Sequence, residues 1–177
     1  MEQKKEIRRE VRQRIKALDE AEKLSSARQI FAAIERDDAF AKARCIALYA
    51  SLADEVPTAE VIERWSGERR VVLPRVEGDV MRFYDYSPEQ MAAGYSGIAE
   101  PTGEVECLPC DIDLIIVPAR AFTISGVRLG RGGGFYDKYM SLDGFRAEKI
   151  GVAFACQIFE ELPLDAHDIT VDKVVNF

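Results

Sequence analysis

The stretch GVRLGRGGGFYDKYM (126–140) combines backbone freedom with fixed positive charge. Four of its five glycines lie within Gly130–Gly134, and Arg128 and Arg131 flank the first of these. Glycine adopts positive φ without strain, so successive N–H groups can converge on an anion. Guanidinium groups match phosphate geometry, and FYDKYM can begin a helix whose first N–H groups are unpaired. These residues predict a phosphate site, with a flexible surface loop as the alternative.

The loop differs from the two commonest nucleotide-binding fingerprints. A dinucleotide fingerprint GxGxxG starting at Gly130 would need glycine where the chain has Phe135. A Walker A loop needs Gly-Lys followed by Ser or Thr, and the chain has no such triplet. The loop is therefore neither a Rossmann fingerprint nor a P-loop.

Basic residues are concentrated at the start of the chain. Seven of the 24 Lys and Arg residues fall in the first 16 positions, and Lys4, Arg8 and Arg12 recur every four residues. On a helix these three would form one row. A solvated charged face is the reading that residue chemistry alone favours. Since the net charge of the whole chain is −7, we expect no attraction to nucleic acid or to anionic membranes.

The cysteines give little sign of metal or redox chemistry. Cys107 and Cys110 form a CxxC, but a structural zinc site would need two more nearby ligands, and the only histidine is the distant His167. Pro109 and the following DID indicate a loop that leads into a strand, whereas a thioredoxin-like motif opens a helix. We expect an incidental loop pair.

The chain has no sign of membrane targeting. No apolar run reaches the length of a membrane span, and the first residues lack the apolar core of a signal peptide. Glu2, Glu6 and Glu10 argue against a mitochondrial presequence. We expect a cytoplasmic protein.

Hydrophobic periodicity predicts helices early in the chain. Residues 3–18 carry one apolar stripe, and Asp19 with Glu22 forms a capping box for a second helix. Thr58 is expected to cap a further helix that carries Trp65.

Short apolar runs between these helices predict strands. They cover residues 45–51, 69–76, 80–87, 112–119, 149–155 and 169–177. The run IDLIIVPA (112–119) is continuously apolar, as in a central parallel strand that is covered on both faces. Alternating helices and strands predict an α/β sandwich with a mostly parallel sheet in a single domain, 1–177. Residues 87–111 look irregular, and a loop of that length is often functional.

The segment RLGRGGGFYD closely resembles the signature RLG-x-G-x-G-[YF]-Y-D of the 5-formyltetrahydrofolate cyclo-ligase family, also called methenyltetrahydrofolate synthetases. The resemblance extends over nearly the whole chain, through KKEIR, LYASLADEVPT, VVLPRV, IAEP, DLIIVP and HDITVDKVV in order. It implies a three-layer α/β/α sandwich. It also implies conversion of 5-formyltetrahydrofolate to 5,10-methenyltetrahydrofolate, with ATP as co-substrate, Mg²⁺ as cofactor, and ADP and phosphate released.

In this family the formyl oxygen is expected to attack the γ-phosphate of ATP, after which N10 closes the ring and phosphate leaves. The protein mainly has to align its two small-molecule substrates and neutralise phosphate charge. We expect a monomer, with no nucleic-acid partner and no membrane association. A folate- or nucleotide-binding protein without turnover is the alternative.

The resemblance also implies site residues, with Arg131 as the catalytic one. ATP-binding residues are Lys4, Lys5, Glu6, Ile7, Arg8, Arg128, Leu129, Gly130, Arg131, Gly132, Gly133, Gly134, Phe135 and Tyr136. Substrate-binding residues are Ala50, Glu55, Gly97, Glu100, Arg131, Gly132, Gly133, Gly134 and Phe135. Metal ligands are Asp137 and Asp168.

Some of these residues have simpler interpretations. Asp137 could be an ordinary first-turn helix residue, Asp168 a turn residue and Glu55 an acid that favours a helix start. Tyr84 could contribute aromatic surface or serve the core. The chain also departs from the family where Phe135 replaces a more usual tyrosine and Gly133 a frequent lysine.

Overall fold

A computed structural model of the chain describes residues 2–177. Its helices are α1 (Glu2–Lys16), α2 (Glu20–Glu35), α3 (Asp38–Lys42), α4 (Ala59–Ser66) and α5 (Phe135–Met140), with 3-10 turns η1 (Tyr95–Gly97), η2 (Pro109–Asp111) and η3 (Ala155–Gln157). None of the helices in this range is both long and apolar enough to cross a membrane.

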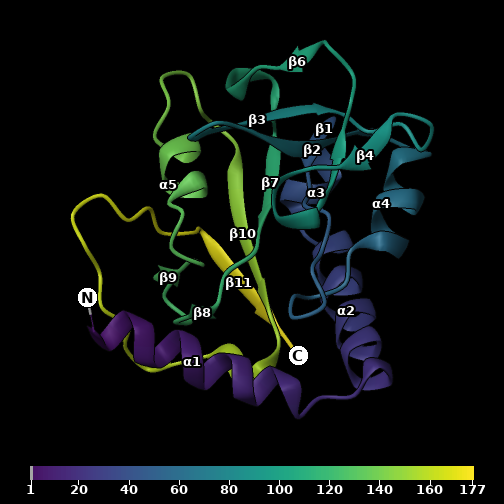
Figure 1. The fold of residues 1–177 in the computed structure, drawn as a ribbon. Helices are drawn as coiled ribbons and strands as arrows, with labels where there is room; N and C mark the ends of the chain where they lie inside the picture. The colour runs from purple at the N-terminus through teal and green to yellow at the C-terminus, as the bar shows by residue number, and fades with distance from the viewer. Residues whose placement is uncertain (1) are drawn as a thin grey trace.

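A seven-stranded sheet forms the centre of the molecule (Figure 1). Its strands, in spatial order, are β11 (Lys173–Asn176), β10 (Glu148–Ala153), β7 (Leu114–Val117), β1 (Cys45–Ala47), β2 (Arg70–Glu77), β3 (Val80–Asp85) and β6 (Glu106–Cys107). Neighbours from β11 to β2 pair in parallel, and β3 and β6 pair antiparallel. The predicted mostly parallel sheet is confirmed.

Two small antiparallel ribbons lie outside this sheet. One pairs β4 (Met91–Ala93) with β5 (Ala99–Pro101), and the other pairs β8 (Ala121–Phe122) with β9 (Arg128–Leu129). Residues 87–111, expected to be irregular, therefore contain three short strands. Strands of two or three residues leave too little alternation in the sequence to reveal them.

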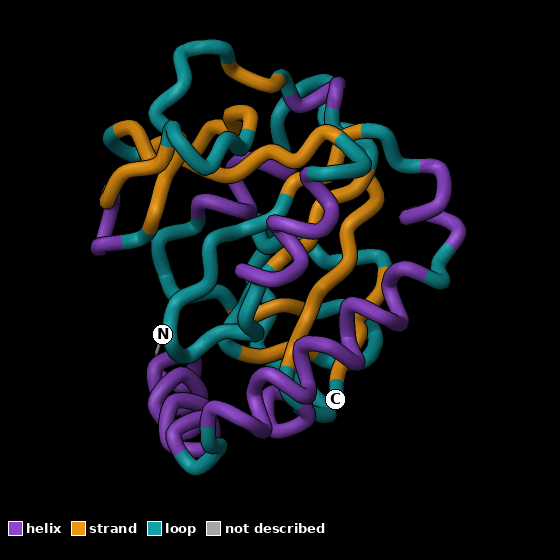
Figure 2. The backbone as a smooth tube through the Cα atoms, turned by 90° about the vertical axis from the view of Figure 1, so that its right-hand side faces the viewer, coloured by secondary structure: helices purple, strands orange, loops and turns teal. Residues whose placement is uncertain are grey.

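Helices cover the sheet on both faces, which confirms the three-layer sandwich. Along β7, Leu114 and Ile116 pack with α1, α2 and α4, whereas Ile115 and Val117 pack on the opposite face with α5. Figure 1 shows α5 on one side of the sheet and α2, α3 and α4 on the other. In Figure 2 the two long helices α1 and α2 run along the lower part of the molecule. The second helical layer is the single six-residue helix α5.

Several predicted boundaries were wrong by a few residues. The first helix ends at Lys16, and the run 112–119 is a strand only over 114–117. The strand expected over 45–51 stops at Ala47, and the last strand covers only Lys173–Asn176. Beyond β1 and β7 the apolar runs continue past the ladder, because Leu48, Tyr49, Ile112 and Ala119 are buried.

The two predicted helix caps had different outcomes. The capping box is confirmed, since Glu22 N donates to Asp19 Oδ1 at 2.8 Å and Asp19 N to Glu22 Oε2 at 2.8 Å. Thr58 precedes α4, but its side chain does not cap that helix. Its fully buried hydroxyl instead donates to the carbonyl oxygen of Tyr49 at 2.6 Å and accepts from Ser51 N at 3.2 Å. These bonds fix the chain that leaves β1.

Candidate active site

A pocket of about 540 Å³ opens at the carboxyl ends of β1 and β7. From β1 the chain continues through α4 to β2, and from β7 it continues through α5 to β10, on the opposite side. The two strands therefore flank a topological switch point, where open α/β sheets bind ligands. Tyr49 and Ala50 line the pocket after β1, and Pro118 and Ala119 line it after β7.

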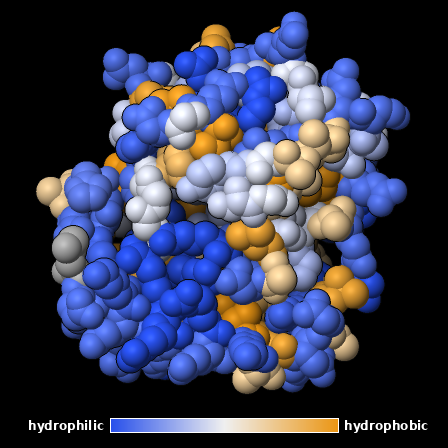
Figure 3. Space-filling view, viewed as in Figure 1, coloured by the Kyte–Doolittle hydropathy of each residue, from blue (hydrophilic) through white to orange (hydrophobic). Residues whose placement is uncertain are grey.

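The pocket has a charged part and an apolar part. The charged part comes from α1, the glycine loop and the loop before β11, and the apolar part from β2, β3 and the β4–β5 ribbon. Tyr95 and Phe135 meet edge to face there, with ring centroids 5.6 Å apart. The apolar lining residues are Pro74, Val76, Met81, Tyr95, Ile98 and Phe135. Figure 3 shows hydrophilic residues gathered over α1 at the lower left of one face.

Most residues that the sequence proposed for the site line this pocket. They are Lys4, Lys5, Arg8, Ala50, Glu55, Glu100, every residue from Arg128 to Tyr136, Asp137 and Asp168. Three do not line it: Glu6 is exposed, Ile7 packs against the core, and Gly97 lies between the lining residues Ser96 and Ile98. On α1, Lys4, Lys5 and Arg8 are thus the residues of this segment that face the pocket.

The glycine loop has the backbone conformation that its composition predicted. Gly132 and Gly134 have φ of 118° and 68°, values that disfavour other residues. A side chain at Gly133 would lie 2.8 Å from the ring of Phe135. Arg8 Nε donates to the carbonyl oxygen of Gly130 at 2.8 Å, which ties the loop to α1. The loop is therefore a shaped wall of the pocket rather than a free surface segment.

Arg131 lies between two carboxylates. Its Nε donates to Glu55 Oε1 at 2.9 Å, and its Nη2 bonds to Asp54 Oδ1. Burial opposes the charge on Arg131, but the bond to Asp54 and the charge of Glu55 outweigh that effect and raise the pKa of the guanidinium. Glu55 is itself held, because its Oε2 accepts from Leu52 N at 2.9 Å. Arg131 is a fixed cation in the pocket wall.

Lys4 also lies between two carboxylates, at the other end of the charged part. Its Nζ is 2.7 Å from Oδ2 of both Asp165 and Asp168. Burial lowers the pKa of Lys4, but the two hydrogen bonds outweigh it and the net shift is upward. His167 lies on the surface with its side chain 78% exposed, and its Nε2 is 3.7 Å from Asp168 Oδ1.

In each of the two aspartates proposed as metal ligands, one carboxylate oxygen accepts no hydrogen bond within residues 2–177. Asp137 Oδ1 lies 2.8 Å from Arg128 Nη2 and accepts from Ile169 N at 2.9 Å, and within residues 2–177 nothing donates to its Oδ2. Asp168 Oδ2 accepts from Lys4 and from Asp165 N, which leaves Oδ1 with only the distant contact to His167. Carboxylate oxygens of this kind suit Mg²⁺, which typically takes one or two carboxylates along with substrate phosphates.

Glu100 anchors the ribbon that covers the apolar part. Its carboxylate is buried and accepts from Val76 N at 3.2 Å and from Tyr95 N at 3.3 Å. A side chain at Gly94 would overlap it at 2.0 Å, so glycine is required there. Glu100 thus ties the β4–β5 ribbon to β2, beside the apolar part of the pocket.

The alternatives for Tyr84 and for the cysteines are resolved by their surroundings. Tyr84 is buried outside the pocket, where its hydroxyl donates to Glu77 at 2.7 Å and its ring lies 3.5 Å below the guanidinium of Arg75. Cys107 is buried and Cys110 exposed, and all four cysteines are free. The sulfur of Cys107 lies 3.7 Å from that of Cys45, outside the CxxC pair.

Sequence reasoning missed other residues of the site, among them Asp54, Arg120, Tyr95 and Asp165. Asp54 contacts both Arg131 and Arg120, Tyr95 lines the apolar part, and Asp165 holds Lys4. Only Asp54 carried a signal, as the neighbour of Glu55 in the sequence. Contacts of Arg120 and Asp165 span more than 60 positions, and Tyr95 meets Phe135 across 40 positions.

A pocket at the switch point of a mostly parallel α/β sheet, with fixed cations in one part and an apolar wall in the other, defines an α/β enzyme that acts on a small charged molecule. The chain belongs to the 5-formyltetrahydrofolate cyclo-ligase family, whose model matches residues 1–176.

Individual relatives agree with this membership. The 5-formyltetrahydrofolate cyclo-ligase of Escherichia coli strain K12 is 31% identical over 175 residues, covering 94% of this chain and 96% of that protein. The mouse (Mus musculus) protein of the same name is 27% identical over 187 residues, covering 97% of this chain and 92% of that one.

Solved structures agree as well. The 5,10-methenyltetrahydrofolate synthetase of Aquifex aeolicus superposes with a TM-score of 0.88 at 34% identity, covering 98% of this chain and 89% of that one. The 5,10-methenyltetrahydrofolate synthetase of Mycoplasma pneumoniae gives 0.76 at 26% identity, covering 97% of both chains. The chain is therefore an enzyme, a ligase of folate one-carbon metabolism.

Proposed function

We propose that this enzyme converts 5-formyltetrahydrofolate to 5,10-methenyltetrahydrofolate at the expense of ATP, with Mg²⁺ as cofactor. One observation carries the proposal: a single pocket joins a set of fixed cations to an apolar, aromatic wall. Phosphates require the first and a planar pterin requires the second. One pocket that holds both can bring the formyl oxygen to the terminal phosphate.

The residues divide the work of this reaction between them. Glu55 accepts hydrogen bonds from the N–H groups of the pterin, beside Ala50 and Phe135. Lys4, Lys5, Arg8 and Arg128 surround the phosphates, together with the backbone of the glycine loop. Arg131 lies between the two regions, with Glu55 as its neighbour at 2.9 Å. It is the residue best placed to stabilise charge on the phosphoryl group as it moves.

The chemistry then proceeds in two steps. The formyl oxygen attacks the γ-phosphorus of ATP, the bond to the bridging oxygen breaks, and ADP leaves. N10 then attacks the activated formyl carbon and loses its proton to solvent, and cleavage of the C–O bond releases phosphate and leaves the methenyl bridge. A bound Mg²⁺, held by Asp137 and Asp168, would supply positive charge to the phosphate oxygens. The protein contributes alignment, charge and exclusion of water.

A direct assay tests the function. The protein is mixed with 5-formyltetrahydrofolate and MgATP, and the absorbance of the methenyl product is followed alongside release of phosphate. We expect both to rise together, with one phosphate per product. Binding of both substrates by calorimetry without product would instead identify a binding protein without turnover. Three further expectations remain predictions: residues 1–177 form one domain, the protein is a monomer, and it acts in the cytoplasm.

A further inference from the structure

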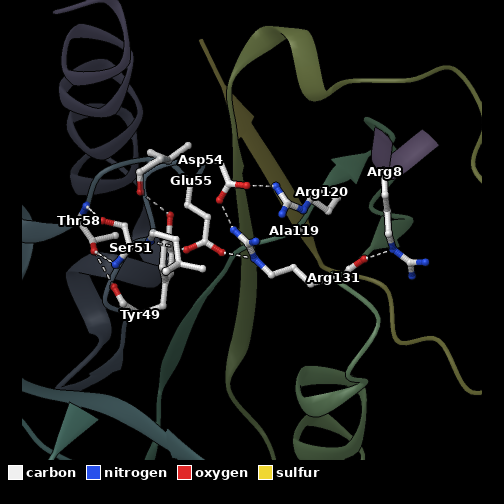
Figure 4. A network of polar contacts seen from close by, with 12 residues as sticks. Arg8, Tyr49, Ser51, Asp54, Glu55, Thr58, Ala119, Arg120 and Arg131 are labelled. Atoms are coloured by element: carbon white, nitrogen blue, oxygen red, sulfur yellow. Dashed lines mark hydrogen bonds and ion pairs between the residues drawn. The ribbon is translucent and has the colours of Figure 1, made fainter. Parts of the chain in front are cut away.

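Arg131 is one member of a chain of charged side chains that continues through Asp54 to Arg120 (Figure 4). Asp54 lies between two arginines and gives one oxygen to each: Oδ1 to Arg131 Nη2 and Oδ2 to Arg120 Nη1. Arg120 is not among the residues that line the pocket, and its side chain is only 10% exposed. The ion pair of Arg120 is with Asp54, so it is linked to Arg131 through that carboxylate.

Arg120 is fixed to the framework of the sheet. It follows β7, and its N–H donates to the carbonyl oxygen of Leu129 at 2.8 Å. Its own carbonyl oxygen accepts from Gln157 Nε2 at 3.1 Å, and Gln157 is almost fully buried. With its backbone bonded in both directions, Arg120 holds Asp54 in one place.

Asp54 in turn determines which donors of Arg131 are available. Glu55 takes Nε and Asp54 takes Nη2, and within residues 2–177 no protein atom accepts from Nη1. The plane of the guanidinium is thereby fixed while one N–H₂ group remains for a ligand. A donor that is oriented before the reaction costs no reorganisation during it.

Glu55 and Asp54 differ in the partners that they bind besides Arg131. The proposed function assigns Glu55 to the pterin, so the bond between Glu55 and Arg131 competes with folate. Asp54 has no such second task, because its other oxygen is already paired with Arg120. When folate draws Glu55 away, Asp54 is the carboxylate that continues to hold Arg131.

We propose that Asp54, held in place by Arg120, is a positioning residue that keeps Arg131 aligned for phosphoryl transfer while Glu55 binds folate. The proposal rests on the proposed function and adds two residues to it. Neither Asp54 nor Arg120 contacts substrate; both act through Arg131.

Kinetics of Asp54→Asn test the idea. Asparagine retains the shape of the side chain but loses the charge that binds two arginines. We expect kcat to fall about tenfold to a hundredfold, the scale expected for a misplaced catalytic group, while KM for folate changes less than about threefold. Asp85→Asn is the matched control, since Asp85 pairs with Arg70 at 2.6 Å on the surface. An unchanged kcat in Asp54→Asn would overturn the proposal.

Double variants separate positioning from general damage. If Asp54 acts through Arg131, then Asp54→Asn should cost almost nothing in an Arg131→Ala background, because residues that act as a unit are not additive. A full additional loss in that background would overturn the proposal. Arg120→Gln, which removes the same link from its other end, should lower kcat by a smaller factor. If Asp54→Asn does not fold, Arg120→Gln is measured in its place, alone and in the Arg131→Ala background.

A measurement without turnover keeps this idea distinct from the proposed function. The Nε–H signal of Arg131 in the NMR spectrum of the free protein should be sharp and slow to exchange, and it should broaden in Asp54→Asn and Arg120→Gln. A wild-type protein that forms no product defeats the proposed function. If neither variant alters the Arg131 signal, Asp54 and Arg120 do not position Arg131, whatever the activity.

Discussion

Arg131 and Lys4, two cations in the charged part of the pocket, each lie between two carboxylates. The residues that hold those carboxylates differ. Arg131 lies between Asp54 and Glu55, and Lys4 lies between Asp165 and Asp168. Behind Arg131 stands Arg120, anchored by backbone bonds next to β7. Lys4 sits in the first turn of α1, against a loop in which Asp165 is 57% exposed.

The chemistry of the two cations makes this difference functional. A guanidinium has five N–H donors in a rigid plane, so Arg131 can keep Asp54 while Glu55 binds folate and still present a free edge. An ammonium is a compact charge with three donors, and two carboxylates already occupy Lys4. One of these, Asp168, is also a proposed metal ligand. Arg131 thus keeps Asp54, which is itself paired with Arg120, whereas the unshared partner of Lys4 is the exposed Asp165.

Removing Asp137 tests the metal side of this comparison and should have the largest effect. Asp137→Ala deletes the free Oδ2 beside the glycine loop, and we expect kcat/KM to fall about a thousandfold, since a metal supplies several kcal/mol of charge stabilisation. Turnover and thermal melting are measured together, with the exposed Asp143→Ala after α5 as the control. Normal activity in folded Asp137→Ala would remove Asp137 from the metal site.

Replacing Arg131 tests the rigid end. Arg131→Ala should lower kcat about a hundredfold to a thousandfold, as does loss of a preorganised donor to developing charge, and folate binding should weaken less. Arg131→Lys should recover little, because an ammonium cannot hold Asp54 and Glu55 in one plane. Steady-state kinetics with calorimetry of folate binding measure both. A variant that loses folate affinity but keeps kcat would make Arg131 a binding residue.

Replacing Lys4 tests the shared end and should have a smaller effect. Lys4→Met removes one phosphate contact but frees Asp168, so the two consequences partly cancel. We expect KM for MgATP to rise roughly tenfold, the scale of one partly exposed charge contact, with kcat within about threefold. Lys16→Met, at the far end of α1, is the control. A loss of kcat as deep as that of Arg131→Ala would show that the two ends are equivalent.

The sequence predicted the parts of the molecule that depend on local pattern. The apolar run in β7, the capping box at Asp19 and the start of α5 after Gly134 follow from periodicity and backbone preference. The glycine loop was found because positive φ and flanking arginines occur together in one short stretch. For these features the cause and the consequence lie within about 15 residues of each other.

Contacts between distant segments could not be predicted in this way. Asp54 meets Arg120 across 66 positions and Lys4 meets Asp168 across 164, and no spacing rule connects such pairs. Thr58 shows the same limit, since a typical capping residue bonds to Tyr49 and Ser51 instead of its own helix. Tertiary packing decides which of several possible partners a polar side chain takes.

The pH dependence of the free energy of unfolding of Asp54→Asn tests the support of Arg131 and has the smallest expected effect. Burial alone would raise the pKa of Asp54, but the bonds from Arg131 and Arg120 outweigh it and lower the pKa below the ordinary 3.8. A carboxyl with a lowered folded-state pKa contributes stability that is complete above its unfolded value and is lost as the pH falls through the folded one. Because Asp54 is a third exposed, we expect a difference from wild type of about 1 kcal/mol at neutral pH.

Urea unfolding of both proteins across pH measures this difference. It should stay constant from pH 7 to 5 and shrink below about pH 4, where the protonated carboxyl of the wild type resembles the amide of the variant. A difference that already changes between pH 7 and 5 would mean that Asp54 titrates near neutrality. The two arginines would then not hold it ionised, and the rigid support that distinguishes Arg131 from Lys4 would be absent.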